Sequence, residues 1–156
     1  MSLKIIESGH PSLSEKCVPL TPFLNDRIEK LRSSMIEVIE TEGIFSLSCP
    51  QVGFPYQMFV VKRDQTDGEY ITFINPEIIS FSEEKITYIE GCLSVPDIKE
   101  EIERPKYVKV RWRDERFNSY EKVLDEFLSR VFQHEYDHLN GISFVERVDR
   151  GYELGI

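Results

Sequence analysis

The chain has few cysteines and histidines and no long apolar run. Its 156 residues include three cysteines and three histidines. An odd number of cysteines in a chain of this length does not form a disulfide framework, so we expect a reducing compartment. No apolar stretch reaches the roughly 20 residues of a membrane-spanning helix. The start, Met1-Ser2-Leu3-Lys4, lacks the core of a signal peptide. These absences predict a protein of the cytoplasm or of an organelle, neither secreted nor bound to a membrane.

Positive charge is scarce as well. The chain holds 19 lysines and arginines against 28 aspartates and glutamates, which gives a net charge of −9. Such a balance disfavours general binding of nucleic acid, and the acidic surface is more simply a solubility feature. Internal repeats, low-complexity tracts and Gly/Ser-rich linkers are also absent. With 40% hydrophobic residues, the chain can bury a core, and we expect one domain spanning residues 1–156.

Two of the three histidines lie in one short stretch, His134-Glu135-Tyr136-Asp137-His138. On a helix, residues four apart lie about 40° apart around the axis and one turn along it, so both imidazoles can bind one ion. Glu135 lies beside the first imidazole, where a carboxylate can take a proton from a metal-bound water or return it. Asp137 either supports the site by orienting a ligand or the segment, or is solvated. The alternative interpretation is a surface helix with two solvated histidines.

The flanking residues predict that this stretch is helical. Asp125 is suited to cap the amino end of a helix, and Glu126 is favourable in its first turn. Asn140-Gly141 ends the pattern, with Gly141 suited to a left-handed residue just past the helix. The apolar positions in between are Phe127, Leu128, Val131, Phe132 and Leu139.

A site with two histidines needs a third protein ligand, and few residues follow His138. The carboxylates among them have no long helix to bring them back, so we expect the third ligand upstream. The best candidate is Cys92, in Glu90-Gly91-Cys92-Leu93-Ser94. This stretch follows residues 86–89, whose β-branched and aromatic side chains favour a strand. Gly91 permits a close approach of the backbone.

Two motifs together carry a resemblance to a known family. Glu90-Gly91-Cys92-Leu93-Ser94, followed by Gln133-His134-Glu135-Tyr136-Asp137-His138, resembles the peptide deformylases. These metallohydrolases remove the N-formyl group from new polypeptides, a step of protein biosynthesis. The resemblance extends from about Ile6 to Val148. It implies antiparallel sheets that wrap a central helix carrying the two histidines.

The resemblance also implies a role for each matched residue. Residues matching Cys92, His134 and His138 bind one divalent metal ion, usually iron(II) in the cell, which zinc, nickel or cobalt can replace. The residue matching Glu135 is the general acid and base. The residue matching Gln51 and the backbone N–H of the one matching Leu93 hold the formyl oxygen. The residues expected to bind the substrate chain are Gly43, Ile44 and Gly91.

An upstream motif departs from the family pattern. The family segment reads Gly-x-Gly-Leu-Ala-Ala-x-Gln, whereas this chain has Gly43-Ile44-Phe45-Ser46-Leu47-Ser48-Cys49-Pro50-Gln51. The second glycine is missing, one residue (Phe45 or Ser46) is extra, and Ser48-Cys49 replaces the alanine pair. We expect a bulge or a different turn between Gly43 and Leu47, which changes the substrate groove more than the catalytic centre. Cys49 is expected to pack like alanine, the alternative being contact with the metal.

The order of elements predicts an α+β fold. Thr21-Pro22 looks like the N-cap and first residue of a helix whose apolar stripe ends near Gly43. Strand-like runs follow at residues 57–62, 70–74, 85–90, 98–103, 107–113 and 119–124, with Asp67-Gly68 as a turn signal between the first two. Strands between an N-terminal helix and a C-terminal metal-binding helix favour α+β over alternating βαβ units. We expect antiparallel β-sheets around a central C-terminal helix.

Three hypotheses for function remain open. The first is an active deformylase that acts on N-formyl-Met peptides and meets nascent chains without the basic C-terminal helix that tethers some relatives to ribosomes. The second is a deformylase-like metallohydrolase in which the altered segment, residues 43–51, has changed the substrate or reduced the rate. The third is a non-catalytic, metal-stabilised binding protein. The retained Glu135 argues against the third, because a structural metal site has no use for a base beside it.

Overall fold

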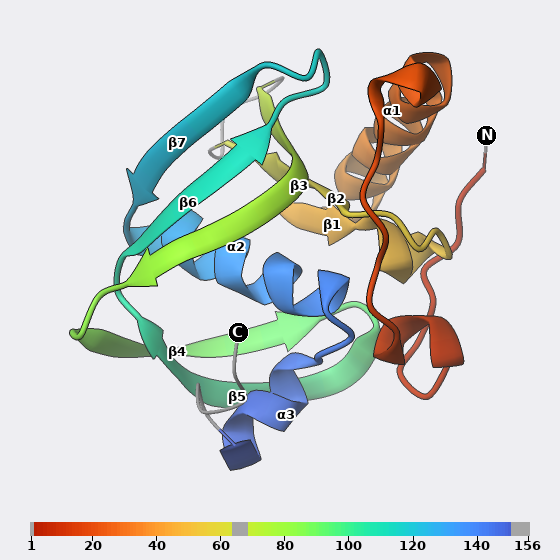
Figure 1. Ribbon diagram of the computed structural model, residues 1–156. Helices are drawn as coiled ribbons and strands as arrows, with labels where there is room; N and C mark the ends of the chain where they lie inside the picture. The colour runs from red at the N-terminus through yellow and green to blue at the C-terminus, as the bar shows by residue number, and fades with distance from the viewer. Residues whose placement is uncertain (1, 64–68, 151–156) are drawn as a thin grey trace.

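The structure is a computed structural model that describes residues 2–63 and 69–150. Figure 1 shows two antiparallel sheets with helix α2 (Glu126–Leu139) between them and helix α1 (Asn25–Glu42) beside the larger sheet. The larger sheet has the strand order β1-β2-β3-β6-β7, and β4 pairs with β5 in the smaller one. The expected α+β architecture around a central helix is therefore confirmed. The expected turn at Asp67-Gly68 lies outside the described residues.

Each of the six expected strands is present. The larger sheet consists of β1 (Ser46–Ser48), β2 (Met58–Lys62), β3 (Tyr70–Phe81), β6 (Val108–Arg113) and β7 (Ser119–Leu124), and the smaller sheet of β4 (Lys85–Cys92) and β5 (Val95–Pro105). The strands β3 and β5 are longer than their sequence patterns indicate. The three-residue β1 was not predicted at all, because so short a run carries no periodicity of its own.

Strand β3 continues past Asn75-Pro76, although this pair would end a regular strand. Asn75 has a positive φ of 50°, and the pairing with β6 shifts register between Ile74 and Glu77. The Asn75 side chain accepts from the backbone N–H of Leu20 at 2.8 Å and donates to its carbonyl at 2.9 Å. These two bonds hold the irregularity in place, so the strand resumes beyond it.

Helix α1 begins later than Thr21-Pro22 indicates. Thr21 precedes a short 3-10 turn, Pro22–Leu24, and its side chain makes no capping hydrogen bond. The α-helix itself runs from Asn25 to Glu42 and buries the apolar stripe that the sequence predicts. Gly43 ends the helix as expected, with φ of 66° and its N–H bonded to the Ile39 carbonyl.

Helix α2 packs one face against the larger sheet through aromatic side chains. Phe132 is fully buried, and its ring centroid lies 5.3 Å from that of Phe59 and 5.1 Å from that of Phe73, both edge to face. Such contacts add to the burial of apolar area that holds the helix on the sheet. The histidine-bearing positions of α2 face the β4–β5 hairpin, since His138 contacts Cys92 at the end of β4.

The start of α2 differs from the expected side-chain cap. Asp125 occupies the cap position, but its side chain makes no capping hydrogen bond. Its backbone carbonyl accepts the first hydrogen bond of the helix, from Ser129 N–H at 3.2 Å. Glu126 has a φ of 49°, so the chain turns into the helix through a left-handed residue. A further helix, α3 (Phe144–Arg150), follows α2 and was not predicted.

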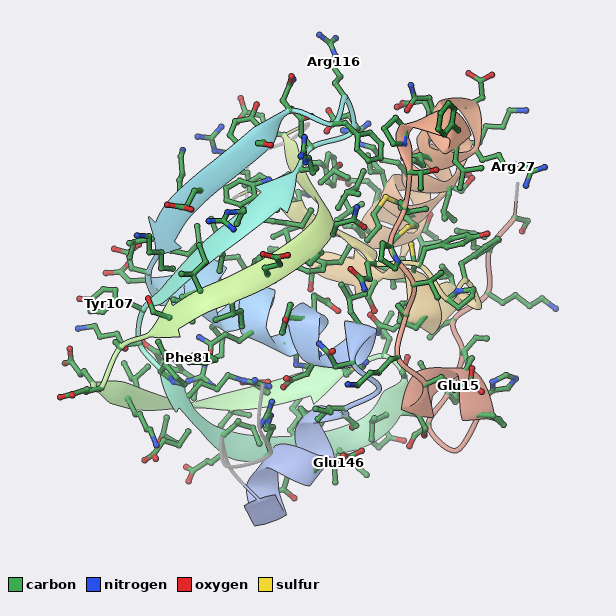
Figure 2. All side chains as sticks on the ribbon, in the orientation of Figure 1. Glu15, Arg27, Phe81, Tyr107, Arg116 and Glu146 are labelled. Atoms are coloured by element: carbon green, nitrogen blue, oxygen red, sulfur yellow. The ribbon has the colours of Figure 1, made fainter. Side chains whose placement is uncertain are left out.

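Charged side chains cover the outside of the molecule. Figure 2 shows Arg27, Arg116 and Glu15 pointing away from the body of the fold, and all three are exposed.

Within residues 2–63 and 69–150, no helix is long and apolar enough to cross a membrane.

The turn after α2 is fixed by a glycine that lies against the N-terminal segment. Gly141 has a φ of 74°, and a Cβ there would lie 2.6 Å from the backbone carbonyl of Ser14. Gly141→Ala should therefore lower the free energy of unfolding by more than the ~1–2 kcal/mol of a left-handed L-residue. Gly43→Ala is the matched control, since Gly43 has a φ of 66° and open space around the added methyl. Urea unfolding of both variants checks this, and equal losses would contradict it.

Candidate active site

Two elements far apart in sequence bring the three expected metal ligands together. Strand β4 ends at Cys92, and helix α2 carries His134 and His138 one turn apart. One donor atom from each of the three residues lies within 4.8 Å of the others. The Cys92 Sγ and His138 Nε2 atoms are 3.4 Å apart. Among the described residues, this is the one group of three or more cysteine, histidine or acidic side chains placed to hold an ion.

The donor set suits a divalent transition metal. One thiolate and two imidazoles form a set that binds zinc, iron, cobalt and nickel, with a coordination position left for water. Burial lowers the pKa of His138 well below its usual value, and the positive charges of His134 and Arg104 act in the same direction. His138 is therefore neutral, and a neutral imidazole has a ring nitrogen with a lone pair that an ion can use. The residues present fit a bound cation.

His134 is oriented by a buried carboxylate. Its Nδ1–H donates to Glu90 Oε1 at 2.9 Å, which leaves Nε2 for the cluster. Burial lowers the pKa of His134, but bonds to Cys92 and Glu90 and the charge of Glu135 outweigh it and raise that pKa to about 10. A cation bound by the three donors would take the place of this proton.

Glu90 belongs to a buried network of charged side chains that joins the hairpin to α2. Arg104, on β5, donates to Glu90 at 2.5 and 2.8 Å and to Asp137 at 2.9 Å. Arg130 also donates to Glu90 at 2.6 Å, and Arg147 donates to Asp137 at 2.9 and 2.6 Å. Arg104 is fully buried. Asp137 therefore orients the helix through two arginines and is not solvated.

Glu135 lies beside the cluster and carries one unpartnered oxygen. The side chain is buried, with an exposed fraction of 2%, and its Oε1 has no hydrogen-bond partner among the described residues. Its Oε2 accepts from the hydroxyl of Ser46. Burial raises the pKa of Glu135 above its usual value, opposed by the charge of His134 and by the hydroxyls of Ser46 and Ser48. Such a carboxyl is placed to exchange a proton.

The Gln51 side chain is held with its amide N–H₂ toward the cluster. Its Oε1 accepts from both the N–H and the hydroxyl of Ser48 at 3.0 Å. Its Nε2 then donates to Cys92 Sγ at 3.1 Å and to Ser94 Oγ at 3.3 Å. Because the carbonyl end is fixed twice, the donor end cannot turn away from the site.

A cavity of about 370 Å³ opens onto these groups. This volume is in the range of small-molecule and peptide sites. Of the residues predicted from sequence, eight line it: Gly43, Ile44, Gln51, Gly91, Cys92, Leu93, His134 and Glu135. His138 lies behind them, buried at the back of the cluster.

The altered segment, residues 43–51, contributes an aromatic side chain and a hydroxyl to the cavity. Phe45 and Phe127 line the cavity, with their rings edge to face and centroids 5.6 Å apart, whereas Ser46 reaches Glu135. The register of β1 with β2 is continuous from Ser46 to Ser48, so the expected bulge is not in this pairing. The chain instead turns at Gly43, where the backbone is left-handed.

Cys49 is not part of the metal cluster. Its side chain is fully buried, and its Sγ lies 3.8 Å from Met35 Sδ in the core beneath α1. Burial raises the pKa of its thiol well above the usual value, which disfavours a thiolate ligand. Packing in place of alanine is the role that the structure supports.

Sequence reasoning missed four residues that shape the site. The sequence marks Ser46 only as part of the departing segment and Glu90 only as part of a motif. Arg104 and Arg130 were not singled out, because an arginine in a strand or a helix surface gives no sign of its partners. A clue is available in hindsight for Glu90, since a ligand histidine needs a carboxylate or carbonyl on its other nitrogen.

A buried carboxylate beside a Cys-His-His cluster, on a helix between antiparallel sheets, is typical of a metal-dependent hydrolase. A family model described as polypeptide deformylase matches residues 2–153. The peptide deformylase of Thermotoga petrophila is 41% identical over 146 residues, covering 94% of this chain and 87% of that protein. That of Treponema pallidum is 39% identical over 149 residues, 96% and 88% of the two chains.

Solved structures agree with the sequence comparison. The peptide deformylase of Thermotoga maritima superposes with a TM-score of 0.87 at 37% identity, covering 94% of this chain and 97% of that one. A class I type b peptide deformylase of Acinetobacter baumannii, solved with Met-Ala-Ser bound, has a TM-score of 0.88 at 30% identity, covering 94% and 98%. The chain belongs to the peptide deformylase family, a family of metal-dependent enzymes.

The ion pairs of Glu90 give a test by pH. Burial favours the neutral acid, but bonds from His134 and Arg104 outweigh it and hold the pKa of Glu90 well below its usual range. Because the folded-state pKa is lowered, this stabilisation is present above the unfolded pKa of about 4.3 and is lost as pH falls below it. Glu90→Gln should lower the unfolding free energy at pH 7 by roughly 3–5 kcal/mol, with a smaller difference at pH 3.5.

The measurement is urea unfolding of both proteins across that pH range, with a chelator present so that metal loss does not contribute. Glu121→Gln is the control, because Glu121 pairs with Arg111 on the exposed face of the sheet and should change stability little at either pH. If the difference in unfolding free energy between wild type and Glu90→Gln grew as the pH fell, the ion pairs of Glu90 would not be the source of the stabilisation.

Proposed function

We propose that this protein removes the N-formyl group from formyl-methionine at the N-terminus of nascent polypeptides. The observation that carries the proposal is the convergence of Cys92, His134 and His138 with Glu135 and Gln51 on one cavity. A metal cluster, a buried carboxylate and an amide donor are the groups that hydrolysis of a linear amide requires. Membership of the deformylase family supports the same reaction.

Cys92, His134 and His138 would hold one divalent ion, iron(II) in the cell by resemblance to the family, with zinc, nickel or cobalt as substitutes. Bound there, the ion lowers the pKa of a coordinated water toward neutrality and so supplies a nucleophile at physiological pH. The hydrogen bond from His134 Nδ1 to Glu90 Oε1, 2.9 Å long, leaves Nε2 as the imidazole nitrogen available to the ion.

Glu135 serves as the acid and base in this proposal. Its unpartnered Oε1 accepts a proton as the water oxygen attacks the formyl carbon. The same oxygen returns the proton to the amine nitrogen as the C–N bond breaks, which releases formate and a free N-terminus. Burial supports the role, because it raises the pKa of Glu135 toward the pH at which a group can both take and give a proton.

Gln51 and Leu93 stabilise the charge that develops on the formyl oxygen. The Gln51 Nε2 is held at the edge of the cluster, 3.1 Å from Cys92 Sγ, and we assign its N–H as one donor to that oxygen. Leu93 lines the same cavity, and we assign its backbone N–H as the second donor. Donors fixed in advance are worth most where water is excluded.

The cavity suits an extended peptide with an apolar first side chain. Gly43, Ile44 and Gly91 line it and leave room for a substrate backbone. The Acinetobacter baumannii enzyme, solved with Met-Ala-Ser bound, supports a peptide of this kind as ligand. Nascent chains in the cytoplasm or in an organelle are the proposed source, and the ribosome is the place where they would be met.

Of the two alternative functions, one is kept and the other is disfavoured. Phe45 and Phe127 on the wall of the cavity favour altered substrate preference as the second candidate. A non-catalytic metal-binding protein is disfavoured, because a structural site has no need of a buried carboxylate with a free oxygen beside it.

The direct test is deformylation of formyl-Met peptides by protein loaded separately with iron(II), nickel and zinc. We expect equimolar formate and free amine, abolished by a chelator and restored by metal. Lack of turnover with every ion would reject the proposal in favour of a binding role.

Glu135→Gln should retain the metal and the fold but lower kcat by about 10²–10⁴-fold, since it removes the proton acceptor and leaves the ligands intact. Metal content and thermal unfolding are measured alongside kcat. His138→Ala is the contrasting variant, expected to lose metal and stability together. Near wild-type turnover of Glu135→Gln would show that another group moves the proton.

A further inference from the structure

The altered segment, residues 43–51, places the hydroxyl of Ser46 directly against the carboxylate of Glu135. Its Oγ donates to Glu135 Oε2. The backbone around it is fixed, because Ser46 pairs with Val61 in register and Lys62 N–H donates to the Phe45 carbonyl at 2.7 Å. A hydroxyl on a paired strand has only its own rotamer to vary, so the bond has a well-defined direction.

The two oxygens of Glu135 are unlike as a result. Oε2 is occupied by Ser46, whereas Oε1 is buried and has no hydrogen-bond partner among the described residues. A carboxylate held by one oxygen cannot turn about its terminal bond without breaking that contact. The free oxygen is therefore kept in one place, which is the requirement for a group that must meet a proton in a defined position.

Neighbouring hydroxyls do not replace this contact. Ser48 lies two residues along β1, but its hydroxyl donates to Gln51 Oε1 at 3.0 Å. Ser94 interacts with the amide nitrogen of the same glutamine at 3.3 Å. The Ser48 hydroxyl lies near enough to Glu135 to lower the pKa of that carboxyl, but its hydrogen bond goes to Gln51. Among the hydrogen bonds of the described residues, it is Ser46 that donates to the carboxylate.

We propose that Ser46 is a positioning residue of the active site, whose hydroxyl fixes Glu135 through Oε2 so that Oε1 is directed to the reacting water. This inference rests on the proposed deformylase function. It assigns a role to a residue of the stretch that departs from the family pattern. The family pattern has a second glycine in this stretch, and a glycine offers no side chain for such a bond. The altered segment therefore affects Glu135, the proton-transfer group, as well as the substrate groove.

Ser46→Ala removes the hydroxyl with little change in volume. We expect kcat to fall by about 10–100-fold, the range for losing a hydrogen bond to a charged group, with KM within about twofold and metal content unchanged. Ser46→Thr keeps a hydroxyl and suits a strand, and it should recover most of the loss. Ser34→Ala is the matched control, because the Ser34 hydroxyl donates to the Lys30 carbonyl within α1 and should leave both constants unchanged.

A readout independent of turnover is the crystal structure of Ser46→Ala with metal bound. We expect the Glu135 carboxylate to rotate or to occupy two positions. An unmoved carboxylate would overturn the inference, as would unchanged kcat, a change confined to KM, or equal loss in Ser46→Ala and Ser46→Thr. If wild-type protein itself does not cleave formyl-Met peptides, the proposed function fails, and the crystal structure still decides whether Ser46 positions Glu135.

Discussion

The site depends on one buried interaction, the bridge that Arg104 makes between Glu90 and Asp137. Glu90 lies on β4 and Asp137 on α2, so this guanidinium joins the strand that carries Cys92 to the helix that carries both histidines. Buried charges are costly unless each is paired, and losing one partner leaves the others uncompensated. Arg130 and Arg147 complete the pairing. The relative placement of strand and helix is therefore fixed by bonds with defined directions, where apolar packing alone would allow sliding.

The same network determines the chemistry of the metal ligands. Glu90 accepts from two arginines and still offers Oε1 to His134 Nδ1. That bond fixes the tautomer of His134 and aims Nε2 at the cluster. Among the described residues, no carboxylate is hydrogen-bonded to His138, and burial keeps that imidazole neutral. The two imidazoles thus become ligands by different means, one through an oriented hydrogen bond and the other through desolvation.

Sequence reasoning predicted the features that local pattern encodes. The helix from its cap position to Gly141, the six strands and the grouping of Cys92 with the two histidines follow from periodicity, turn residues and motif spacing. The network around Arg104 could not be predicted in this way, because its partners lie 14 and 33 residues away and nothing in the sequence marks an arginine as buried. The cap of α2 also differed, since the Asp125 side chain makes no capping hydrogen bond and Glu126 takes up a left-handed conformation.

The departing segment shows how a strand can alter a site without disturbing the core. Ser46 and Ser48 lie two apart on β1 and face the same side, where they meet Glu135 and Gln51, while Leu47 between them is fully buried with the residues of α1. A shift of one residue would put Leu47 against Glu135 and Gln51 and both hydroxyls into the core. The pairing of Leu47 with Val60 excludes that shift, because only this register packs the leucine among the apolar residues beneath α1. The apolar core beneath α1 therefore sets the position of the hydroxyls. Hydrophobic packing on one face of β1 fixes where the polar side chains on its other face lie.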